Sequence, residues 1–126
     1  MKAQTEADLA RAVELRVQKR YDEALAVLAD VEARLAGAPL AEPTVADRRA
    51  EAGYQRGLVL EEAGRLADAV EAYEDVLKDY GRAPAAGHAH LSLAHALMRL
   101  GKTDEAAAAW MSAAHQHPKQ IGRAHV

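Results

Sequence analysis

The stretch "GRLADAVEAYEDVL" at residues 64–77 occurs in three related forms along the chain. The other two are "KRYDEALAVLADV" (19–31) and "GKTDEAAAAWMSAA" (101–114). Each form opens with a turn and then places an alanine at the same point, followed four residues later by a larger side chain. The alanines are Ala24, Ala69 and Ala106, and the larger side chains are Leu28, Tyr73 and Trp110. Recurrence of this kind predicts a repeat architecture.

A second helical stretch precedes each of these units. It carries a small residue twelve positions before the alanine and a leucine three positions after that small residue. The small residues are Ala12, Gly57 and Ala94, and the leucines are Leu15, Leu60 and Leu97. Equivalent positions are therefore separated by 45 residues (24 to 69) and by 37 residues (69 to 106). We interpret each repeat as a pair of helices.

Apolar side chains recur at three- and four-residue steps along the whole chain, as in Ala89, Leu93, Ala96 and Leu100. This periodicity predicts six helices, near 5–19, 22–36, 44–63, 66–80, 84–100 and 103–117. Thr5 and Thr44 each have an aspartate three residues on, which indicates helix N-caps. Alanine is the most frequent residue and phenylalanine is absent, which favours an all-α fold with closely packed helices.

The composition excludes several classes of function. A net charge of −3 argues against a nucleic-acid partner, because binding to phosphates needs a basic surface. The chain has no cysteine, so disulfides and thiolate zinc sites are excluded. Neither an apolar signal segment nor a long uncharged apolar run is present. We therefore expect a cytoplasmic protein with no membrane partner.

The second and third repeats resemble the tetratricopeptide repeat. Residues 54–77 keep Gly57, Leu60, Gly64, Ala69 and Tyr73, and residues 90–118 keep Leu93, Ala94, Gly101, Ala106, Ala113 and Pro118. The first repeat is weaker, with Ala12, Leu15, Tyr21, Ala24 and Leu28. The resemblance implies one domain over 1–118, a right-handed α-superhelix of three helix-turn-helix repeats at about 5–36, 44–80 and 84–117. Stacking buries the apolar face that one helix pair cannot bury alone.

The resemblance also implies a function, because the family binds peptide segments of partner proteins in a concave groove lined by the first helix of each pair. We expect an adaptor or scaffold of this kind, with a protein or peptide partner, no enzymatic activity and no cofactor. The expected groove residues are Arg16, Tyr54, Gln55, Leu58, Glu61, Glu62, Ser92, His95, Met98 and Arg99. Leu9, Val13 and Leu91 belong either to this face or to the core.

Two other classes of function stay open at this point. One is a homo-oligomeric assembly module, and the other is a histidine metal-binding protein. Five of the six histidines lie within residues 88–118, but their spacing does not favour a metal site. His88 and His95 share a helix face roughly 10 Å apart along its axis, and the pairs 88/90 and 115/117 diverge. We expect no metal site, and we expect His90 to fill the edge of the core.

The C-terminal region departs from the rest of the chain. Residues 106–114 carry no charge, and a helix that is apolar all round expects cover on more than one face. Residues 121–126, "IGRAHV", match a common short-read sequencing adapter translated as protein. We expect residues 119–126 to be a non-native tail, and the native chain to continue past about Gln120 with a helix that covers Trp110 and Met111. Without that helix, the C-terminal helix should favour self-association.

The repeat register makes a stability prediction at Ala69 and Ala106. Each alanine should lie where two helices approach most closely, so a larger side chain there overpacks the contact. We expect Ala69→Leu and Ala106→Leu each to cost about 1–3 kcal/mol of unfolding free energy. Thermal denaturation followed by circular dichroism measures this cost, and unchanged melting temperatures for both variants would contradict the register.

Overall fold

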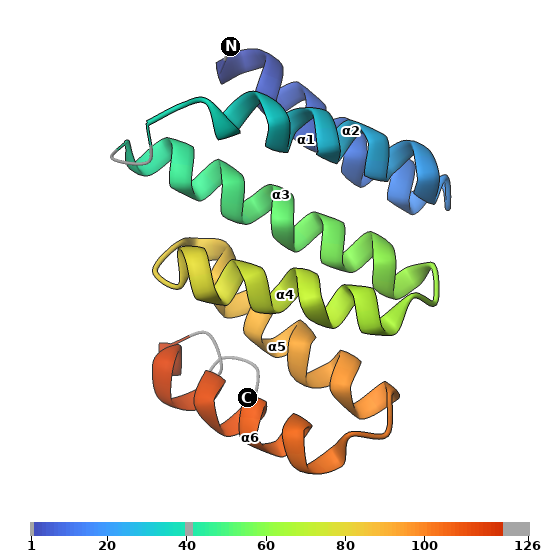
Figure 1. Ribbon diagram of the computed structural model, residues 1–126, viewed down its shortest axis with the longest axis vertical. Helices are drawn as coiled ribbons and strands as arrows, with labels where there is room; N and C mark the ends of the chain where they lie inside the picture. Colours follow the sequence, from blue (N-terminus) through green and yellow to red (C-terminus); the bar gives the residue numbers. More distant parts are fainter. Residues whose placement is uncertain (1, 40–41, 120–126) are drawn as a thin grey trace.

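The computed structural model describes residues 2–39 and 42–119, which form six α-helices and no strand (Figure 1). The helices are α1 (Lys2–Val17), α2 (Tyr21–Ala36), α3 (Pro43–Glu62), α4 (Leu66–Tyr80), α5 (Pro84–Arg99) and α6 (Thr103–Gln116). The predicted all-α fold with three helix pairs is confirmed, and the helix bounds differ from the predicted ones by a few residues. Residues 120–126, most of the expected tail, lie outside the described residues.

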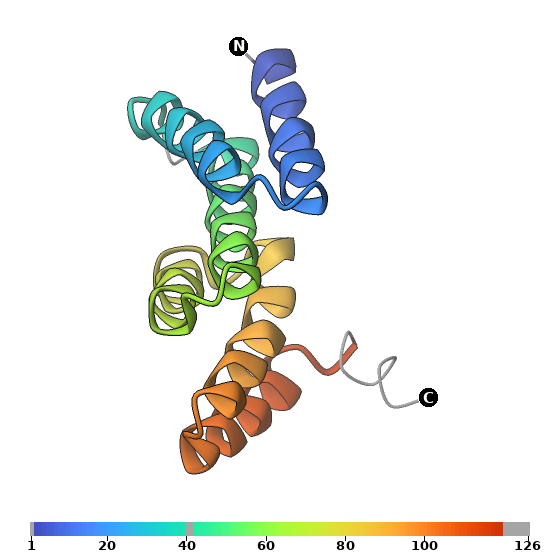
Figure 2. The same cartoon turned by 90° about the vertical axis from the view of Figure 1, so that its right-hand side faces the viewer.

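The six helices stack in chain order, from α1 at one end to α6 at the other (Figure 1). Each helix packs against the next, and α3 also contacts both α1 and α5. The first helices of the three pairs therefore form one layer, with α2 and α4 on one side of it (Figure 2). The predicted coiling into a right-handed superhelix stays a prediction.

The turn inside each helix pair has the same hydrogen bonds in all three repeats. The backbone N–H groups of Arg20, Arg65 and Lys102 donate to the carbonyls of Leu15, Leu60 and Leu97 at 2.9, 2.8 and 2.9 Å. The residue before each donor, namely Lys19, Gly64 or Gly101, has a φ of 62°, 83° or 82°. This pattern ends a helix by a residue in the left-handed region, where glycine is least strained. The repeat is thus reproduced in the backbone, even where lysine replaces glycine.

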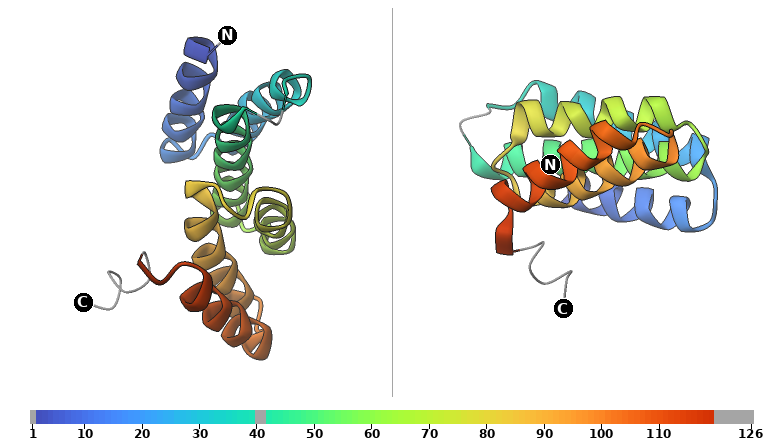
Figure 3. Two further views of the ribbon diagram at one scale, coloured as in Figure 1. Left: turned by 90° about the vertical axis from the view of Figure 1, so that its left-hand side faces the viewer. Right: turned by 90° about the horizontal axis from the view of Figure 1, so that it is seen from below.

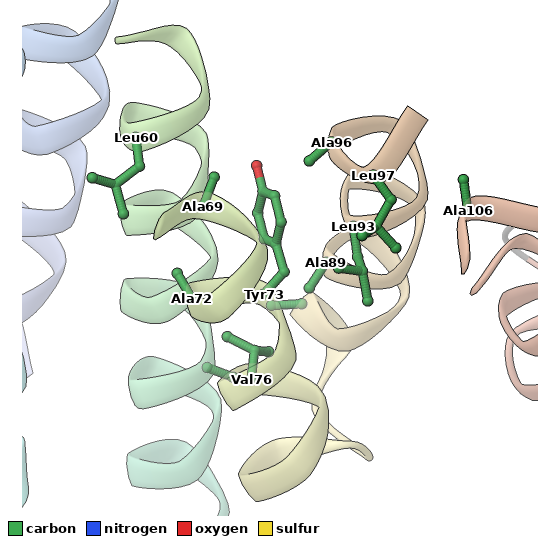
Figure 4. Close-up of a cluster of buried hydrophobic side chains, with 12 residues drawn as sticks. Leu60, Ala69, Ala72, Tyr73, Val76, Ala89, Leu93, Ala96, Leu97 and Ala106 are labelled. Carbon is green, nitrogen blue, oxygen red and sulfur yellow. The ribbon is translucent and has the colours of Figure 1, made fainter. Parts of the chain in front are cut away.

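The core consists of two clusters, one around Leu28 and one around Tyr73, and both side chains are fully buried. Ala24 and Ala69 are 0% exposed and Ala106 is 5% exposed, as expected for the closest helix approaches. Figure 4 shows the Tyr73 ring beside Ala69 and Ala72 of α4 and Ala89 and Ala96 of α5. Small residues on both sides leave room for this one large ring.

Gly57 of α3 is where the Tyr73 ring comes closest. A Cβ atom at this glycine would lie 2.2 Å from Tyr73 Cε1 and 2.5 Å from Cδ1, far inside van der Waals contact. Only the absence of a side chain therefore allows α3 and α4 to cross at this distance. The same need explains why Gly57 occupies a helix interior, where glycine is otherwise unfavourable.

The two predicted N-caps are wrong. Helix α1 begins at Lys2, so Thr5 lies inside the helix; it is 2% exposed, and Arg34 Nη1 of α2 donates to its hydroxyl at 3.3 Å. Asp8 pairs with the same arginine at 2.8 Å. Helix α3 begins at Pro43, one residue before Thr44, because proline suits the first helical position. A threonine-aspartate spacing fits a helix interior as well as a cap.

None of the helices in the described residues combines the length and the apolar character that a bilayer crossing requires.

The Gly57 crossing gives a test with a definite sign. On helix propensity alone, Gly57→Ala should stabilise α3 by about 1 kcal/mol. We expect net destabilisation instead, because the new methyl group overpacks the Tyr73 ring, a defect that costs about 1–3 kcal/mol. Urea denaturation measures the difference.

Gly37→Ala is the matched control for this test. Gly37 ends α2 with φ −87°, and a methyl group added there would have no neighbouring atom within 4 Å, so alanine fits without strain. We expect no loss, and a gain of up to about 1 kcal/mol, from the lower entropy of the unfolded chain. If both variants stabilised the chain, the close crossing would not exist in solution.

Candidate functional site

A hollow of about 380 Å³ lies between α3 and α5, in the layer formed by the first helices. We call it the α3–α5 hollow and define it by Leu58, Glu61, Glu62, Leu91, Ser92, His95 and Arg99. Six of the ten predicted groove residues are in this set, and Leu91 joins them from the residues left open between groove and core. Glu61 thus meets His95 and Arg99, 34 and 38 residues further along the chain, because α5 packs beside α3.

Glu61 is the centre of the polar contacts in this hollow. Its side chain is 9% exposed, and a buried carboxylate needs partners for its charge. Tyr73 donates its hydroxyl to Oε1 at 2.8 Å, and His95 Nδ1 lies 2.7 Å from Oε2. Arg99 Nη1 is 3.4 Å from the same Oε2. One carboxylate therefore joins α3 to a core tyrosine and to two side chains at the surface.

The contact with Glu61 assigns the tautomer of His95. An ionised carboxylate only accepts hydrogen bonds, so the proton must sit on Nδ1. In the neutral imidazole, Nε2 is then an acceptor, and the side chain is 65% exposed. His95 can thus accept a hydrogen bond from a ligand without breaking its contact with Glu61.

Burial, and then the negative charge of Glu61, hold the pKa of the Tyr73 hydroxyl well above its ordinary value. Tyr73 therefore stays protonated and remains a donor throughout the physiological range. The repeat pattern identifies Tyr73 only as a large side chain, and it does not predict the hydrogen bond to Glu61. The available signal was a tyrosine, in place of an aliphatic side chain, at a core position: a buried hydroxyl needs a partner.

Arg16, Tyr54 and Gln55, three further predicted groove residues, do not line the α3–α5 hollow. Arg16 of α1 reaches Glu62 at 2.5 Å and so extends the polar rim toward the first repeat. Tyr54 is half-buried behind the hollow, with its ring centroid 5.9 Å from that of His88 and 6.2 Å from that of Tyr73. Gln55 is buried at 7% exposure and donates to Glu51 at 3.0 Å.

Met98 lies in a different hollow, between α5 and α6. This α5–α6 hollow has a volume of about 510 Å³ and includes Met98, Ala106, Ala107, Trp110 and Met111, with His95 at its edge. Met98 and Met111 are 58% and 72% exposed. Seven of the ten predicted groove residues thus line two neighbouring hollows, and His95 belongs to both.

Ser92, His95 and Glu61 are residue types that serve together in hydrolase triads, but their arrangement here differs. The Ser92 side chain lies close to the side chains of Tyr54 and Tyr73. No hydrogen bond joins Ser92 to His95 among the residues that the structure describes. The nucleophile–base contact that activates a serine is therefore not formed.

No group of three or more histidine, aspartate or glutamate side chains in residues 2–39 and 42–119 is placed to hold a metal ion. His90 is 6% exposed, which confirms its expected place at the core. Its ring meets that of His117 edge-on, with centroids 5.6 Å apart. This pair supports the packing of α5 against the end of α6.

Comparison with protein families identifies the repeat. The model of the tetratricopeptide repeat matches residues 54–121, which is more than half of the chain. The chain belongs to the tetratricopeptide repeat family. Tetratricopeptide repeats are generally non-catalytic modules for protein–protein interaction. A comparison with curated protein sequences finds no significant match.

His90 gives a prediction about pH and stability. Burial, followed by the nearby His117, lowers the pKa of His90 below the ordinary histidine value of 6.5. The unfolded chain therefore binds a proton more readily than the folded chain, so stability must fall as pH drops below about 6.5. We expect urea midpoints to decline between about pH 7 and pH 5, where histidines titrate.

Replacing the imidazole isolates its share of this decline. We expect His90→Leu to reduce the fall in stability over that pH range, and His115→Leu, at an exposed position, is the matched control. Equal pH dependence in His90→Leu and the unsubstituted chain would show that His90 is protonated freely in the folded state.

Proposed function

We propose that the α3–α5 hollow binds a short segment of a partner protein. The observation that supports this most is the set of contacts made by Glu61. These contacts hold His95 and Arg99 beside the apolar side chains of Leu58 and Leu91. Ligand sites combine apolar surface with a few fixed polar groups, since the first supplies affinity and the second supplies orientation. A volume of about 380 Å³ falls in the range of such sites.

The polar groups at this site are held in place before any ligand arrives. Glu61 is anchored by Tyr73 from the core, and it positions His95 through a 2.7 Å contact. A ligand therefore need not restrain these side chains itself, which lowers the entropy cost of binding. The rim is close to neutral, because Arg16 pairs with Glu62 and Arg99 lies near Glu61.

These features favour a particular kind of segment. An apolar side chain would contact Leu58 and Leu91, and a donor beside it, such as a backbone N–H or a hydroxyl, would reach His95 Nε2. A strongly charged segment has less to gain from a rim whose own charges are already paired. We therefore propose a largely uncharged segment with one apolar anchor.

Peptides selected from a random library on the 126-residue chain test this proposal. We expect His95→Ala and Arg99→Ala each to weaken the selected peptides at least about tenfold, as loss of a central contact typically does. These two residues are 65% and 44% exposed in their side chains, so their removal should leave the fold intact. Leu58 is a poorer choice because it also packs against the core.

Arg65→Ala is the matched control. Arg65 pairs with an acidic neighbour, Asp68, as Arg99 does with Glu61, but it lies at the start of α4, away from the hollow. We expect this variant to bind the selected peptides with unchanged affinity. Peptides that bind all three variants as tightly as the unsubstituted chain would rule out the α3–α5 hollow as their site.

A further inference from the structure

Helix α6 lies at one end of the helix stack (Figure 3). The α5–α6 hollow at this end carries three large exposed apolar side chains. Met98, Trp110 and Met111 are 58%, 42% and 72% exposed. Ala106 and Ala107 lie between them. Large apolar side chains that are exposed together on one surface can mark a site of interaction.

The first two repeats show what covers the equivalent surface. Leu28 and Tyr73, the counterparts of Trp110, are both 0% exposed. In each case the first helix of the following pair supplies cover: Ala52 and Val59 of α3 pack in the cluster around Leu28, and Ala89 and Ala96 of α5 pack in that around Tyr73. The α5–α6 hollow is therefore equivalent to the surfaces on which the first helix of a following repeat packs.

Helix α1 is itself a first helix, and it presents the face that its counterparts bury. The repeat spacings of 45 and 37 residues make Ala7 equivalent to Ala52 and Ala89, which are buried in the junctions between repeats. Ala7 is exposed, as are Ala3 and Ala10 on the same side of α1. Glu14 stands where α3 and α5 have Val59 and Ala96, so a junction made by α1 is more polar than the two inside the chain.

One pair of repeat positions gives α1 a specific match to the α5–α6 hollow, which a helix of unrelated sequence would lack. At the junction of α1 with α3, Arg16 pairs with Glu62; at the junction of α3 with α5, Glu61 lies near Arg99. Arg16 and Glu61 occupy the same repeat position, and so do Glu62 and Arg99. These contacts show that the two positions meet across every junction inside the chain, with complementary charges.

At the next junction the same two positions are Met98 and, on an incoming copy of α1, Val17. Both are apolar, and they are 58% and 68% exposed. The positions that carry opposite charges within the chain thus carry two matching apolar side chains at its two ends. Burying both together would remove apolar surface from water at each end.

We propose that the α5–α6 hollow of one molecule receives α1 of a second copy, so that the chain associates head to tail. The contact joins two different surfaces, and it therefore leaves one hollow and one α1 unoccupied in every linear assembly. It continues the packing that already joins α2 to α3 and α4 to α5. The polar Glu14 in this face fits an association that depends on concentration.

Two variants, each blocked on one surface, test the proposal on the 126-residue chain by sedimentation velocity over a range of concentrations. Met98→Glu blocks the hollow, and Val17→Glu blocks α1. We expect the average mass of the unsubstituted chain to rise with concentration, and each variant to associate at least about tenfold more weakly, because a charge is buried without a partner. An equimolar mixture of the two variants should form dimers that grow no further.

Charge exchange provides a second measurement. Combining Met98→Glu with Val17→Arg in one chain recreates the acid–arginine pair found at Glu61 and Arg99, and it should restore association that each substitution alone removes. The matched control is Ala29→Glu, an exposed position whose counterpart in the second repeat is Glu74. We expect it to associate like the unsubstituted chain, and circular dichroism should show all variants folded.

Three results would each overturn the proposal. The first is an unsubstituted chain that stays monomeric at every concentration, because no second copy then occupies the α5–α6 hollow. A Val17→Glu variant that still dimerises joins through two copies of α6, which is a symmetric contact. A mixture of the two blocked variants that stays monomeric shows that α1 and the hollow are not partners.

Discussion

The crossing of α3 and α4 at Gly57 is the constraint on which the rest of the structure depends. A missing side chain lets the Tyr73 ring lie against α3, at a point where any Cβ would come within 2.2 Å of it. From there the hydroxyl reaches Glu61, a nearly buried acid that lies one turn further along α3. The packing of α3 against α4 thus provides a hydrogen-bond donor for the nearly buried carboxylate of Glu61.

The Glu61 carboxylate links this helix crossing to side chains at the surface. It contacts His95 and Arg99 of α5, so a residue that is nearly buried orients two that are exposed. The polar groups of the α3–α5 hollow are therefore supported from the core behind them. A site on helices supported in this way is better defined than one on loops, which suits recognition more than it suits chemistry.

Equivalent positions of the three repeats share a backbone and differ in chemistry. Arg16, Glu61 and Met98 occupy one repeat position but have different surroundings. Arg16 forms an ion pair, Glu61 is nearly buried and accepts a hydrogen bond from Tyr73, and Met98 lies in an exposed apolar hollow. Leu28, Tyr73 and Trp110 likewise differ in what covers them, since only the first two have a following helix in the described part of the chain. The repeat supplies geometry, and individual side chains decide which junctions hold together by charge and which by apolar contact.

The sequence alone determined the helices, their pairing and their register, because these follow from local periodicity and from the recurrence of Ala24, Ala69 and Ala106. It also placed six of the ten expected groove residues in one hollow, since the face of a helix follows from 3.6 residues per turn. Only the tertiary structure decided that Thr5 binds Arg34 instead of capping a helix, and that Gln55 is buried. Only it separated Met98 from the α3–α5 hollow and joined Tyr73 to Glu61. These outcomes depend on which neighbouring helix supplies a partner or a cover, and the spacing of residues within one helix carries no information about that neighbour.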